Sequence, residues 1–504
     1  VTIGVGIALL FDFLLKNIRS RFIEHISLDV DMRMGQKIIA RLAKVSFNKL
    51  DFKSGQISNL FRQFDTLKDF LTSATIVALV DLPFVFLYIW VIYLIGGNLF
   101  IVPTVVAGLA FLIAFAAHIS VSINRSSSAK HGLQKSQTIL EMAAGLETIK
   151  ASNIISTFKQ RYSNSIQVYS HSKKKSRGSV QLASQALQFL QQSAQVGIIF
   201  YGVYLVQSGD LTMGGLIASV ILLGKVIAPV SQVAQTLMRL NSAIEAKNTI
   251  ADFLTKTHLA DRVKISRPVL RGNFSFRNVS LEFGHDKAPV IDALTLEIIP
   301  GEKICVVGSN GSGKSTFMKL LTGLYSPSKG SVYLDNTDME NLDNSDFAAN
   351  VGVVYQDPWL FSGTIRQNLL AKKPYASQEE IDFALDASCA RLVIERLENG
   401  LDFQVGENGK GLSHGEKQVI CIARAMVGHP SVLLFDEPTS ALDGKTEQML
   451  ADNLRLHFSK ATCIFITHRP AIGKFSDRIL HLEKGQLLAD TTSEVFFSRQ
   501  KSKL

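Results

Sequence analysis

The strongest chemical signal in the chain is a glycine-rich run, Gly308-Ser309-Asn310-Gly311-Ser312-Gly313-Lys314-Ser315-Thr316. It follows an apolar stretch, residues 304–307, and precedes a helical pattern, residues 317–324, which is the strand–loop–helix setting of a phosphate-binding loop. Glycines let backbone N–H groups surround phosphates, and the helix N-terminus adds positive potential. Lys314 can therefore reach the β- and γ-phosphates of a nucleotide, and the Ser315 hydroxyl can ligate Mg²⁺.

An acidic pair, Asp436-Glu437, ends a second apolar run, Val432-Leu433-Leu434-Phe435. In nucleotide hydrolases Mg²⁺ is held by a carboxylate at the C-terminal end of a strand near the phosphate-binding loop. Asp436 fits that role, by direct contact or through water, and Glu437 is then placed to polarise or deprotonate the attacking water. The pair could instead only start a turn, but its position downstream of a phosphate-binding loop favours the catalytic interpretation.

These residues must be positioned by elements of the second half of the chain. At 504 residues the chain is too long for one hydrophobic core, which predicts two or more domains. From residue 274 to residue 483, short apolar runs interleave with helical stretches, a pattern that predicts a mostly parallel α/β core. The cysteines all lie in this half without metal or redox spacing, so we expect reduced structural thiols at Cys305, Cys389, Cys421 and Cys463.

The first half instead contains uncharged apolar runs of membrane-spanning length. A bilayer core requires roughly 20 apolar residues in a helix. Four runs meet this requirement, at residues 75–95, 99–121, approximately 187–206 and 211–230. Residues 1–15 have the composition of the remaining part of a fifth span. We therefore expect the sequence to be truncated at its N-terminus, with a sixth span preceding it in the intact protein.

The distribution of charge assigns the sides of the membrane. Lys and Arg concentrate in the two long connections, whereas the short connections, residues 96–98 and 207–210, contain neither. The positive-inside rule therefore places both long connections in the cytosol. This asymmetry also accounts for most of the net charge of +10 without a nucleic-acid partner. Each of the two long connections has about 60 residues, far more than an ordinary loop, so we expect both to be structured. The spacing of their apolar residues predicts helices that continue into the cytosol.

One ionisable residue, Asp81, falls inside the predicted span 75–95 and is followed by Leu82-Pro83. An intramembrane charge is by default a candidate functional site. The alternatives are a carboxylate that is satisfied near the interface and a helix kink set by Pro83.

Three segments organise the chain as a whole. Residues 1–253 are predicted to form the transmembrane domain. Residues 254–271 are polar and broken by Pro268, so they are interpreted as a linker. Residues 272–504 are predicted to form the soluble, nucleotide-binding domain.

The second half resembles the nucleotide-binding domain of an ATP-binding cassette transporter. Besides the loop and the acidic pair, four motifs are similar to its Q-loop, signature motif, D-loop and His switch, at Val354-Tyr355-Gln356-Asp357, Leu412-Ser413-His414-Gly415-Glu416, Ser440-Ala441-Leu442-Asp443 and Thr467-His468-Arg469. Phe283 stands where the family places an aromatic ring on the adenine. The implied fold is an all-α transmembrane exporter domain followed by an α/β P-loop nucleotide-binding domain with an antiparallel β subdomain.

The resemblance also implies roles for single residues. Gln356 would sense Mg²⁺ and the nucleophilic water, and His468 would face the γ-phosphate of the ATP held by residues 308–316. The implied assembly is a homodimer with two composite ATP sites, completed across the dimer contact by Ser413, Gly415 and Asp443.

Two signature positions depart from the family's usual Leu-Ser-Gly-Gly-Gln, since His414 replaces Gly and Glu416 replaces Gln. The two groups on which we expect the motif to act, the Ser413 hydroxyl and the Gly415 N–H, remain available. We therefore expect ATPase activity to survive, with His414 adding bulk and Glu416 adding a negative charge near the start of a helix.

The order of the domains, membrane part first, resembles that of exporters and not of importers. Residues 80–87 and 208–218 are similar to type I secretion exporters of large repeat-containing toxins and adhesins of Gram-negative bacteria. The implied function is ATP-driven export of an unfolded polypeptide with a C-terminal signal across the inner membrane. The implied partners are a periplasmic adaptor and an outer-membrane channel.

Three alternatives share parts of this pattern. A peptide exporter would carry a cysteine protease domain upstream, a lipid flippase has the same architecture, and a regulatory or nucleic-acid-associated cassette protein would transport nothing. The membrane spans argue against the last alternative. Upstream Cys and His residues of a protease would favour the first. Stimulation of the ATPase by lipid, and not by a substrate's C-terminal segment, would favour the second.

Overall fold

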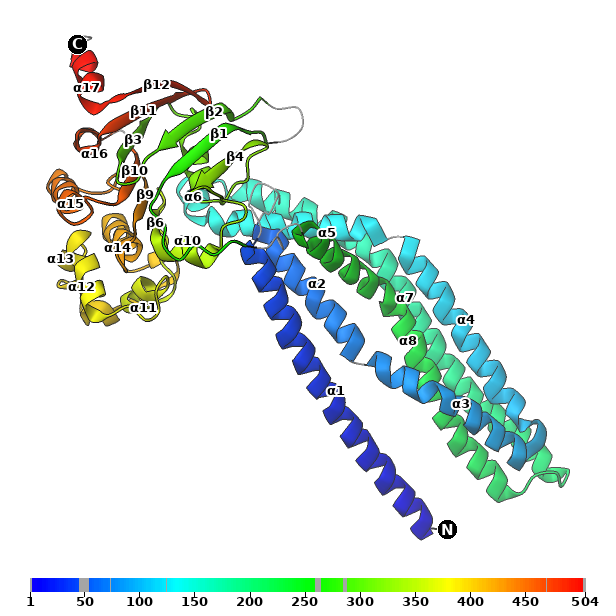
Figure 1. The fold of residues 1–504 in the computed structure, drawn as a ribbon. Helices are drawn as coiled ribbons and strands as arrows, with labels where there is room; N and C mark the ends of the chain where they lie inside the picture. Colours follow the sequence, from blue (N-terminus) through cyan, green and yellow to red (C-terminus); the bar gives the residue numbers. More distant parts are fainter. Residues whose placement is uncertain are drawn as a thin grey trace. The chain divides into compact units, whose positions relative to one another are not determined.

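A computed structural model of the chain describes residues 2–44, 54–72, 74–123, 125–258, 264–283, 288–467 and 469–501. These residues form two compact units, an all-helical unit before residue 261 and an α/β unit after it (Figure 1). The change from one unit to the other falls within residues 254–271, the segment interpreted from the sequence as a linker.

The first unit is a bundle of long helices (Figure 1). Strongly apolar segments fold as helices in a membrane because every backbone N–H and C=O must then be satisfied within the segment. The core of the bundle contains fully buried Ile92, Leu99, Ile198 and Leu223. The elements are α1 (Thr2–Lys44), α2 (Ser54–Thr72), α3 (Ala74–Gly96), the 3₁₀ turn η1 (Gly97–Phe100), α4 (Ile101–Ile123), α5 (Arg125–Ala144), α6 (Leu146–Ala151), α7 (Ile155–Gln207) and α8 (Met213–His258).

Within the described residues, three segments are long and apolar enough to cross a membrane: Asp81–Ser120, Gly178–Gln207 and Met213–Leu237. The first has 40 residues and comprises most of α3, η1 and most of α4, which is enough for two crossings at roughly 20 residues each. These segments coincide with the four runs predicted from the sequence. A span at residues 1–15 is not among them and stays a prediction. The long connections between the runs are helical, and α7 alone has 53 residues.

The second unit is built on two sheets. The larger has the strand order β12-β11-β3-β10-β9-β6, in which every neighbouring pair is parallel except β11 and β12. The smaller is antiparallel, in the order β2-β1-β4-β5. The predicted α/β domain with an antiparallel β subdomain is thereby confirmed.

The strands are β1 (Phe274–Leu281), β2 (Ile291–Ile298), β3 (Lys303–Val307), β4 (Lys329–Leu334), β5 (Thr337–Asp338), β6 (Val351–Val354), β7 (Gly363–Thr364), β8 (Gln404–Val405), β9 (Val432–Asp436), β10 (Thr462–Ile466), β11 (Arg478–Glu483) and β12 (Gln486–Thr492). The helices are α9 (Lys314–Leu321), α10 (Asn344–Asn350), α11 (Ile365–Leu370), α12 (Gln378–Ala387), α13 (Arg391–Ile394), α14 (His414–Met426), α15 (Gly444–His457), α16 (Pro470–Phe475) and α17 (Ser493–Lys501), with 3₁₀ turns η2 (Gly400–Asp402) and η3 (Glu407–Gly409).

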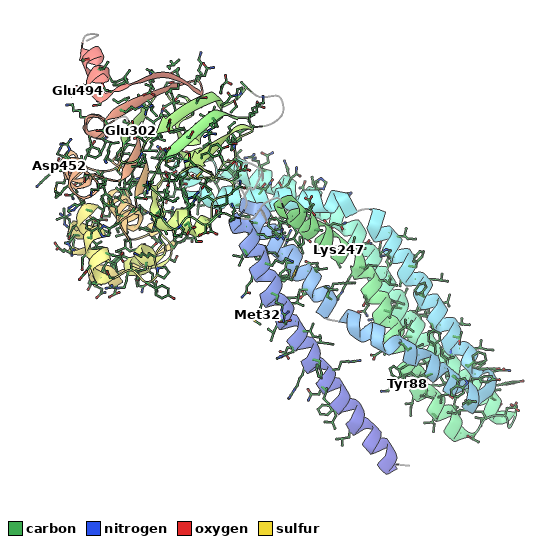
Figure 2. The ribbon with its side chains drawn as sticks, viewed as in Figure 1. Met32, Tyr88, Lys247, Glu302, Asp452 and Glu494 are labelled. Atoms are coloured by element: carbon green, nitrogen blue, oxygen red, sulfur yellow. The ribbon has the colours of Figure 1, made fainter. Side chains whose placement is uncertain are left out.

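The centre of the larger sheet is buried on both faces, which is why its strands are continuous apolar runs. Every residue of β9 and β10 is buried, and the rings of Phe435 and Phe465 stack at 5.2 Å between these strands. An ion pair of 3.0 Å joins Arg478 at the start of β11 to Glu302, which precedes β3. Figure 2 labels Glu302 among the side chains of this unit.

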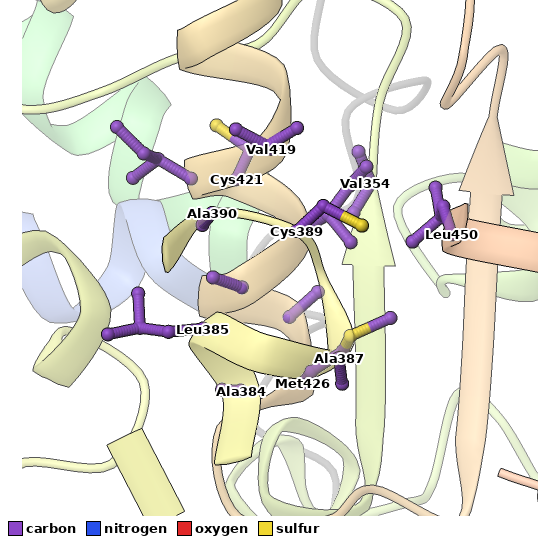
Figure 3. Packing of buried hydrophobic residues seen from close by; sticks show 14 of the residues in the cluster. Val354, Ala384, Leu385, Ala387, Cys389, Ala390, Val419, Cys421, Met426 and Leu450 are labelled. Atoms are coloured by element: carbon purple, nitrogen blue, oxygen red, sulfur yellow. The ribbon is translucent and has the colours of Figure 1, made fainter. Parts of the chain in front are cut away.

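Helix α14 packs in the core of this unit with residues on all of its sides buried, among them Val419, Cys421 and Met426 (Figure 3). All four cysteines are free and buried. Burial raises the pKa of the Cys305 and Cys463 thiols to about 12, so both are neutral at physiological pH. These observations agree with the prediction of reduced structural thiols.

In the helical unit, Asp81 of α3 has a partner from a distant part of the sequence. The Arg19 guanidinium of α1 donates a hydrogen bond to the Asp81 carboxylate at 2.8 Å, and about a third of each side chain is exposed. Of the interpretations considered for Asp81, this contact favours a satisfied carboxylate. The ion pair links the first helix to the first of the strongly apolar helices.

Removing one charge of this pair is expected to weaken the attachment of α1. Asp81→Asn should lower the free energy of unfolding by about 1 kcal/mol, the upper end for partly exposed ion pairs, because Arg19 then lacks a counter-charge. Thermal unfolding of the full chain in lipid nanodiscs measures the effect. The exchanged pair Arg19→Asp with Asp81→Arg should recover most of the loss. An equal loss in Asp81→Asn and the exchanged pair would contradict a role for the ion pair.

Candidate nucleotide-binding and catalytic site

The phosphate-binding loop lies between β3, which ends at Val307, and α9, which begins at Lys314. Gly308 passes so close to the next strand that a Cβ atom there would lie 2.1 Å from the carbonyl oxygen of Leu482. Gly313 precedes the helix with a φ of +102°, a conformation that side chains other than glycine rarely adopt. The strand–loop–helix setting expected from the sequence is therefore present, and its glycines are required by the backbone.

The Lys314 side chain folds back over this loop. Its ammonium group donates hydrogen bonds to the carbonyl oxygens of Gly308 at 2.7 Å and Ser309 at 3.0 Å. The Ser309 hydroxyl donates to the carboxylate of Glu483 at 3.0 Å. The Ser312 hydroxyl is buried and has no hydrogen-bond partner within the described part of the chain. The loop thus combines a cation with a polar group that the protein itself leaves unsatisfied.

Asp436 ends β9 beside this loop and is only 5% exposed. The Ser315 hydroxyl, at the start of α9, lies beside this carboxylate and favours its ionised form. Burial is the main cause that raises the pKa of Asp436 to about 6, and the adjacent Glu437 raises it further, while Lys314 and Ser315 oppose the shift. A buried carboxylate that is short of positive charge, next to a hydroxyl, is the kind of oxygen-ligand set that Mg²⁺ occupies beside phosphates.

Glu437 has a left-handed backbone, with φ at +49°. Two contacts hold it there: its N–H donates to the carbonyl of Ile466 in β10 at 2.8 Å, and its carbonyl accepts from the Gln418 side chain at 3.2 Å. Non-glycine residues in this region persist only where the surroundings enforce them, and they concentrate at functional sites. Gln418, fully buried on α14, was not identified from the sequence.

The third strand end belongs to β6, which pairs in parallel with β9 through Val354 and Phe435. Gln356 follows β6 directly after Tyr355 and is exposed. Because carboxyl ends of parallel strands meet at one edge of a sheet, Gln356 emerges at the same edge as Asp436 and the phosphate-binding loop.

The segment after β10 reaches the same edge. His468 lies outside the described residues, so its expected role stays a prediction. Its neighbour Arg469 donates to the carbonyl of Ser440 at 3.3 Å and forms an ion pair of 3.6 Å with the buried carboxylate of Glu447. Arg469 thereby attaches the predicted His switch to the predicted D-loop.

The signature residues form the start of α14. The Ser413 hydroxyl accepts a hydrogen bond from the N–H of Glu416, and the Glu416 carboxylate accepts one from the N–H of Ser413 at 2.7 Å, which is a complete capping box. The negative charge expected to be added here by Glu416 therefore satisfies a backbone donor and complements the helix dipole. His414 is exposed. A Cβ atom at Gly415 would lie 2.9 Å from the carbonyl oxygen of Ala441, so the D-loop leaves no space for a side chain there.

Asp443 and Phe283 complete the residues predicted from the sequence. Asp443 caps α15, accepting from the Thr446 N–H at 2.8 Å and from its hydroxyl, and these hydrogen bonds lower the pKa of Asp443. Phe283 follows β1 and is partly exposed, with its ring edge-on to that of Tyr325 at 5.4 Å. Phe283 is therefore accessible, and it lies beside Tyr325, a residue that was not identified from the sequence.

Comparison with known proteins identifies the family. The ABC transporter model matches residues 291–440, and the ABC transporter transmembrane region matches residues 1–230. The chain is 30% identical over 491 residues to the leukotoxin translocation ATP-binding protein LktB of Bibersteinia trehalosi, a match that covers 97% of this chain and 69% of that protein. The chain belongs to the ABC transporter family. The toxin RTX-I translocation ATP-binding protein of Actinobacillus pleuropneumoniae matches it with the same identity and coverage.

A solved structure of a bacterial Atm1-family ABC exporter with ATP bound is similar to this ABC transporter over both units. The TM-score is 0.81 at 27% sequence identity, and the match covers 97% of this chain and 87% of the other. The chain is therefore a membrane protein that couples ATP hydrolysis to transport. Its order of domains, a membrane part followed by a nucleotide-binding part, is that of the exporter.

The capping box at the signature motif predicts how Glu416 can be replaced. Glu416→Gln should leave the free energy of unfolding of the nucleotide-binding unit unchanged, because a Gln side chain can also accept from the Ser413 N–H. Glu416→Ala should lower it by roughly 0.5–1 kcal/mol through loss of that acceptor. Differential scanning fluorimetry of the full chain in detergent compares the variants. If Glu416→Gln were as unstable as Glu416→Ala, the carboxylate would have a role other than capping.

Proposed function

We propose that this ABC transporter is the ATPase and permease of a type I secretion system, exporting an unfolded polypeptide with a C-terminal signal. The observation that carries the proposal is the similarity to toxin translocation proteins, which extends over 97% of the chain and so includes the membrane part. We place the protein in the inner membrane of a bacterium, with the nucleotide-binding unit in the cytosol. It would act with a periplasmic adaptor and an outer-membrane channel, and without nucleic acid.

In the proposed reaction, residues 308–316 bind the phosphates of ATP and Phe283 stacks on the adenine. Lys314 exchanges its carbonyl contacts for the β- and γ-phosphates, which are stronger acceptors because they are charged. Glu437 takes a proton from a water molecule whose oxygen attacks the γ-phosphorus. The bond from that phosphorus to the bridging oxygen then breaks, which yields ADP and phosphate.

Magnesium fits the residues beside the phosphates. Ser315, Asp436 and Gln356 would hold Mg²⁺ directly or through water, and the ion would neutralise the charge that develops on the phosphate oxygens. The raised pKa of Asp436 is consistent with this assignment, because a nearby cation would return the carboxyl to its ionised form. His468 would contact the γ-phosphate after β10.

The proposed assembly is a homodimer in which each copy completes the other's site. The Ser413 hydroxyl and the Gly415 N–H would bind the γ-phosphate held by the partner, with Asp443 at the same contact. ATP would therefore favour the closed dimer, and taking such an equilibrium from 1:99 to 99:1 requires roughly 5.5 kcal/mol of differential binding. Hydrolysis removes the shared γ-phosphate, and the dimer reopens.

The assignment of Glu437 can be tested by a substitution that keeps its shape. Glu437→Gln should lower the rate of ATP hydrolysis about 100-fold or more, because the amide cannot accept the proton of the attacking water. Binding of a fluorescent ATP analogue should be retained, since the phosphate-binding loop is unchanged. The control Glu379→Gln, on the exposed face of α12, removes the same charge and should hydrolyse ATP normally. Hydrolysis by Glu437→Gln at the unsubstituted rate would refute the role.

The transported substrate can be identified by deleting the gene and comparing the culture media. We expect one large polypeptide to disappear from the medium by quantitative mass spectrometry, with the lipid composition of the membranes unchanged. Restoring the full-length gene should restore it, whereas a Glu437→Gln copy should not. A change in lipid distribution with an unchanged set of secreted proteins would instead favour the flippase, and loss of a short processed peptide would favour the peptide exporter.

A further inference from the structure

Helix α7 carries a line of glutamines inside its membrane-spanning segment, Gly178–Gln207. Their spacing alternates between four and three residues, which places all of them on one side of the helix. The line rises about 21 Å along the helix axis at 1.5 Å per residue. We call this line the glutamine stripe; it consists of Gln181, Gln185, Gln188, Gln192 and Gln195.

Two other faces of α7 in this segment are apolar. One is buried in the bundle and packs with α4 and α8 through Ala183, Leu187, Ala194 and Ile198. The other is apolar and exposed, with 68–80% of each side chain accessible at Leu182, Phe189, Val196 and Phe200. Hydrocarbon can cover this second face at no cost. The helix therefore has a buried face, an apolar exposed face and the glutamine stripe.

The stripe itself is unsuited to hydrocarbon. All five glutamines are exposed, and within the described residues none of their carboxamides has a hydrogen-bond partner. Each carboxamide has two donors and an acceptor, and leaving such a group unpaired in an apolar medium costs several kcal/mol. A helix in a membrane must therefore turn the stripe toward water or toward a polar partner.

Helix α8 repeats the pattern on the other side of the turn that joins it to α7. Its outward positions have the same alternating spacing and lie equally many residues from the turn, at Lys225, Ala228, Gln232, Gln235 and Arg239. All are exposed except half-buried Gln232. At four of these five depths, all except that of Ala228, polar side chains thus occur on both helices, as expected where both border a polar path. Neither set contains an acidic residue.

The geometry points to the glutamine stripe as a binding surface for the main chain of an extended polypeptide in transit. This inference rests on the proposed function and assigns a substrate-contacting surface within the membrane. A carboxamide offers the same donor and acceptor as a peptide group, so it can pair with any main chain whatever the side chains are. At about 3.3 Å per residue, the 21 Å stripe spans about six residues of an extended chain.

The chemistry disfavours other occupants. A lipid would need an apolar groove for its chains, whereas the stripe is polar along its length and has no cation of its own; the cations of the α8 set, Lys225 and Arg239, lie only at the two ends of that set. Each amide hydrogen bond contributes only about 0.5–1.5 kcal/mol in exchange with water, so a bound segment can release and advance. A surface of several weak, equivalent contacts holds an unfolded chain without fixing its register. The remaining occupant is the same stripe of a second copy, which the test below distinguishes.

Thiol labelling tests whether the stripe borders an aqueous path. Full-length Gln188→Cys and Gln192→Cys in native membranes should react with a membrane-impermeant maleimide at least roughly tenfold faster than the controls Phe189→Cys and Val196→Cys. The native cysteines are buried and provide a low background. Equal, slow labelling at all four positions would overturn the inference. So would a disulfide between two copies at position 188 in a protein that resists the maleimide, because the second copy would then cover the stripe.

Transport tests whether the stripe acts on the polypeptide. The triple variant Gln185→Leu, Gln188→Leu, Gln192→Leu should export at least roughly tenfold less of the polypeptide identified by gene deletion per ATP hydrolysed, because three amide contacts are lost. The triple Asn variant should restore most export, and Phe189→Leu should leave it unchanged. Thermal unfolding excludes misfolded variants. Unchanged export by the triple Leu variant would overturn the inference. If deletion instead revealed no secreted polypeptide, the proposed function would fail, while labelling would still report on the path.

Discussion

The parallel register of β3, β10, β9 and β6 is the constraint on which the nucleotide site depends. Parallel strands end at a common edge, so residues separated by more than a hundred positions in the sequence, Lys314 and Asp436, are placed beside each other. The buried strands hold this register through contacts such as the stacked rings of Phe435 and Phe465. Shifting one strand by a residue would reverse which face its side chains occupy and would move a residue such as Asp436 away from the phosphate-binding loop.

The same edge explains why Asp436 and Glu437 differ although they are adjacent. Asp436 is the last residue of β9, so it is buried and its pKa is raised to about 6. Glu437 leaves the strand in a left-handed conformation held by Ile466 and Gln418, which carries its side chain away from the buried position. In the proposed mechanism, one carboxylate would bind the cation and the other would reach a water molecule. The left-handed turn separates these two proposed roles.

The sequence predicted those features that depend on local patterns. The phosphate-binding loop, the alternation of strands and helices and the four apolar runs between residues 75 and 230 follow from residue spacing, and the structure has each of them. The features that it did not predict depend on contacts between distant segments. The Gln418 side chain on α14 donates a hydrogen bond to the carbonyl of Glu437, and Arg19 on α1 donates one to Asp81. No local pattern in the sequence indicates either contact. Glu416 is an intermediate case, since Ser-x-x-Glu is a capping signal, but it was interpreted only as a departure from the family motif.

The glutamines of α7 show a related limit in the membrane part. Their spacing is visible in the sequence, but spacing alone does not say whether a polar line faces the bundle, lipid or a path. The burial of Ala183, Leu187 and Ala194 shows that another side of the helix faces the bundle, and the cost of an unpaired amide argues against lipid. A polar path remains.

The two units then require opposite kinds of recognition. The nucleotide site uses charged, buried groups because ATP must shift the proposed equilibrium between open and closed dimers by a large factor. Hydrolysis then removes the bound γ-phosphate and releases the dimer. A path has no reaction of its own to release a bound chain, so its contacts must be weak enough to break thermally, and neutral amides meet that requirement where charges would not.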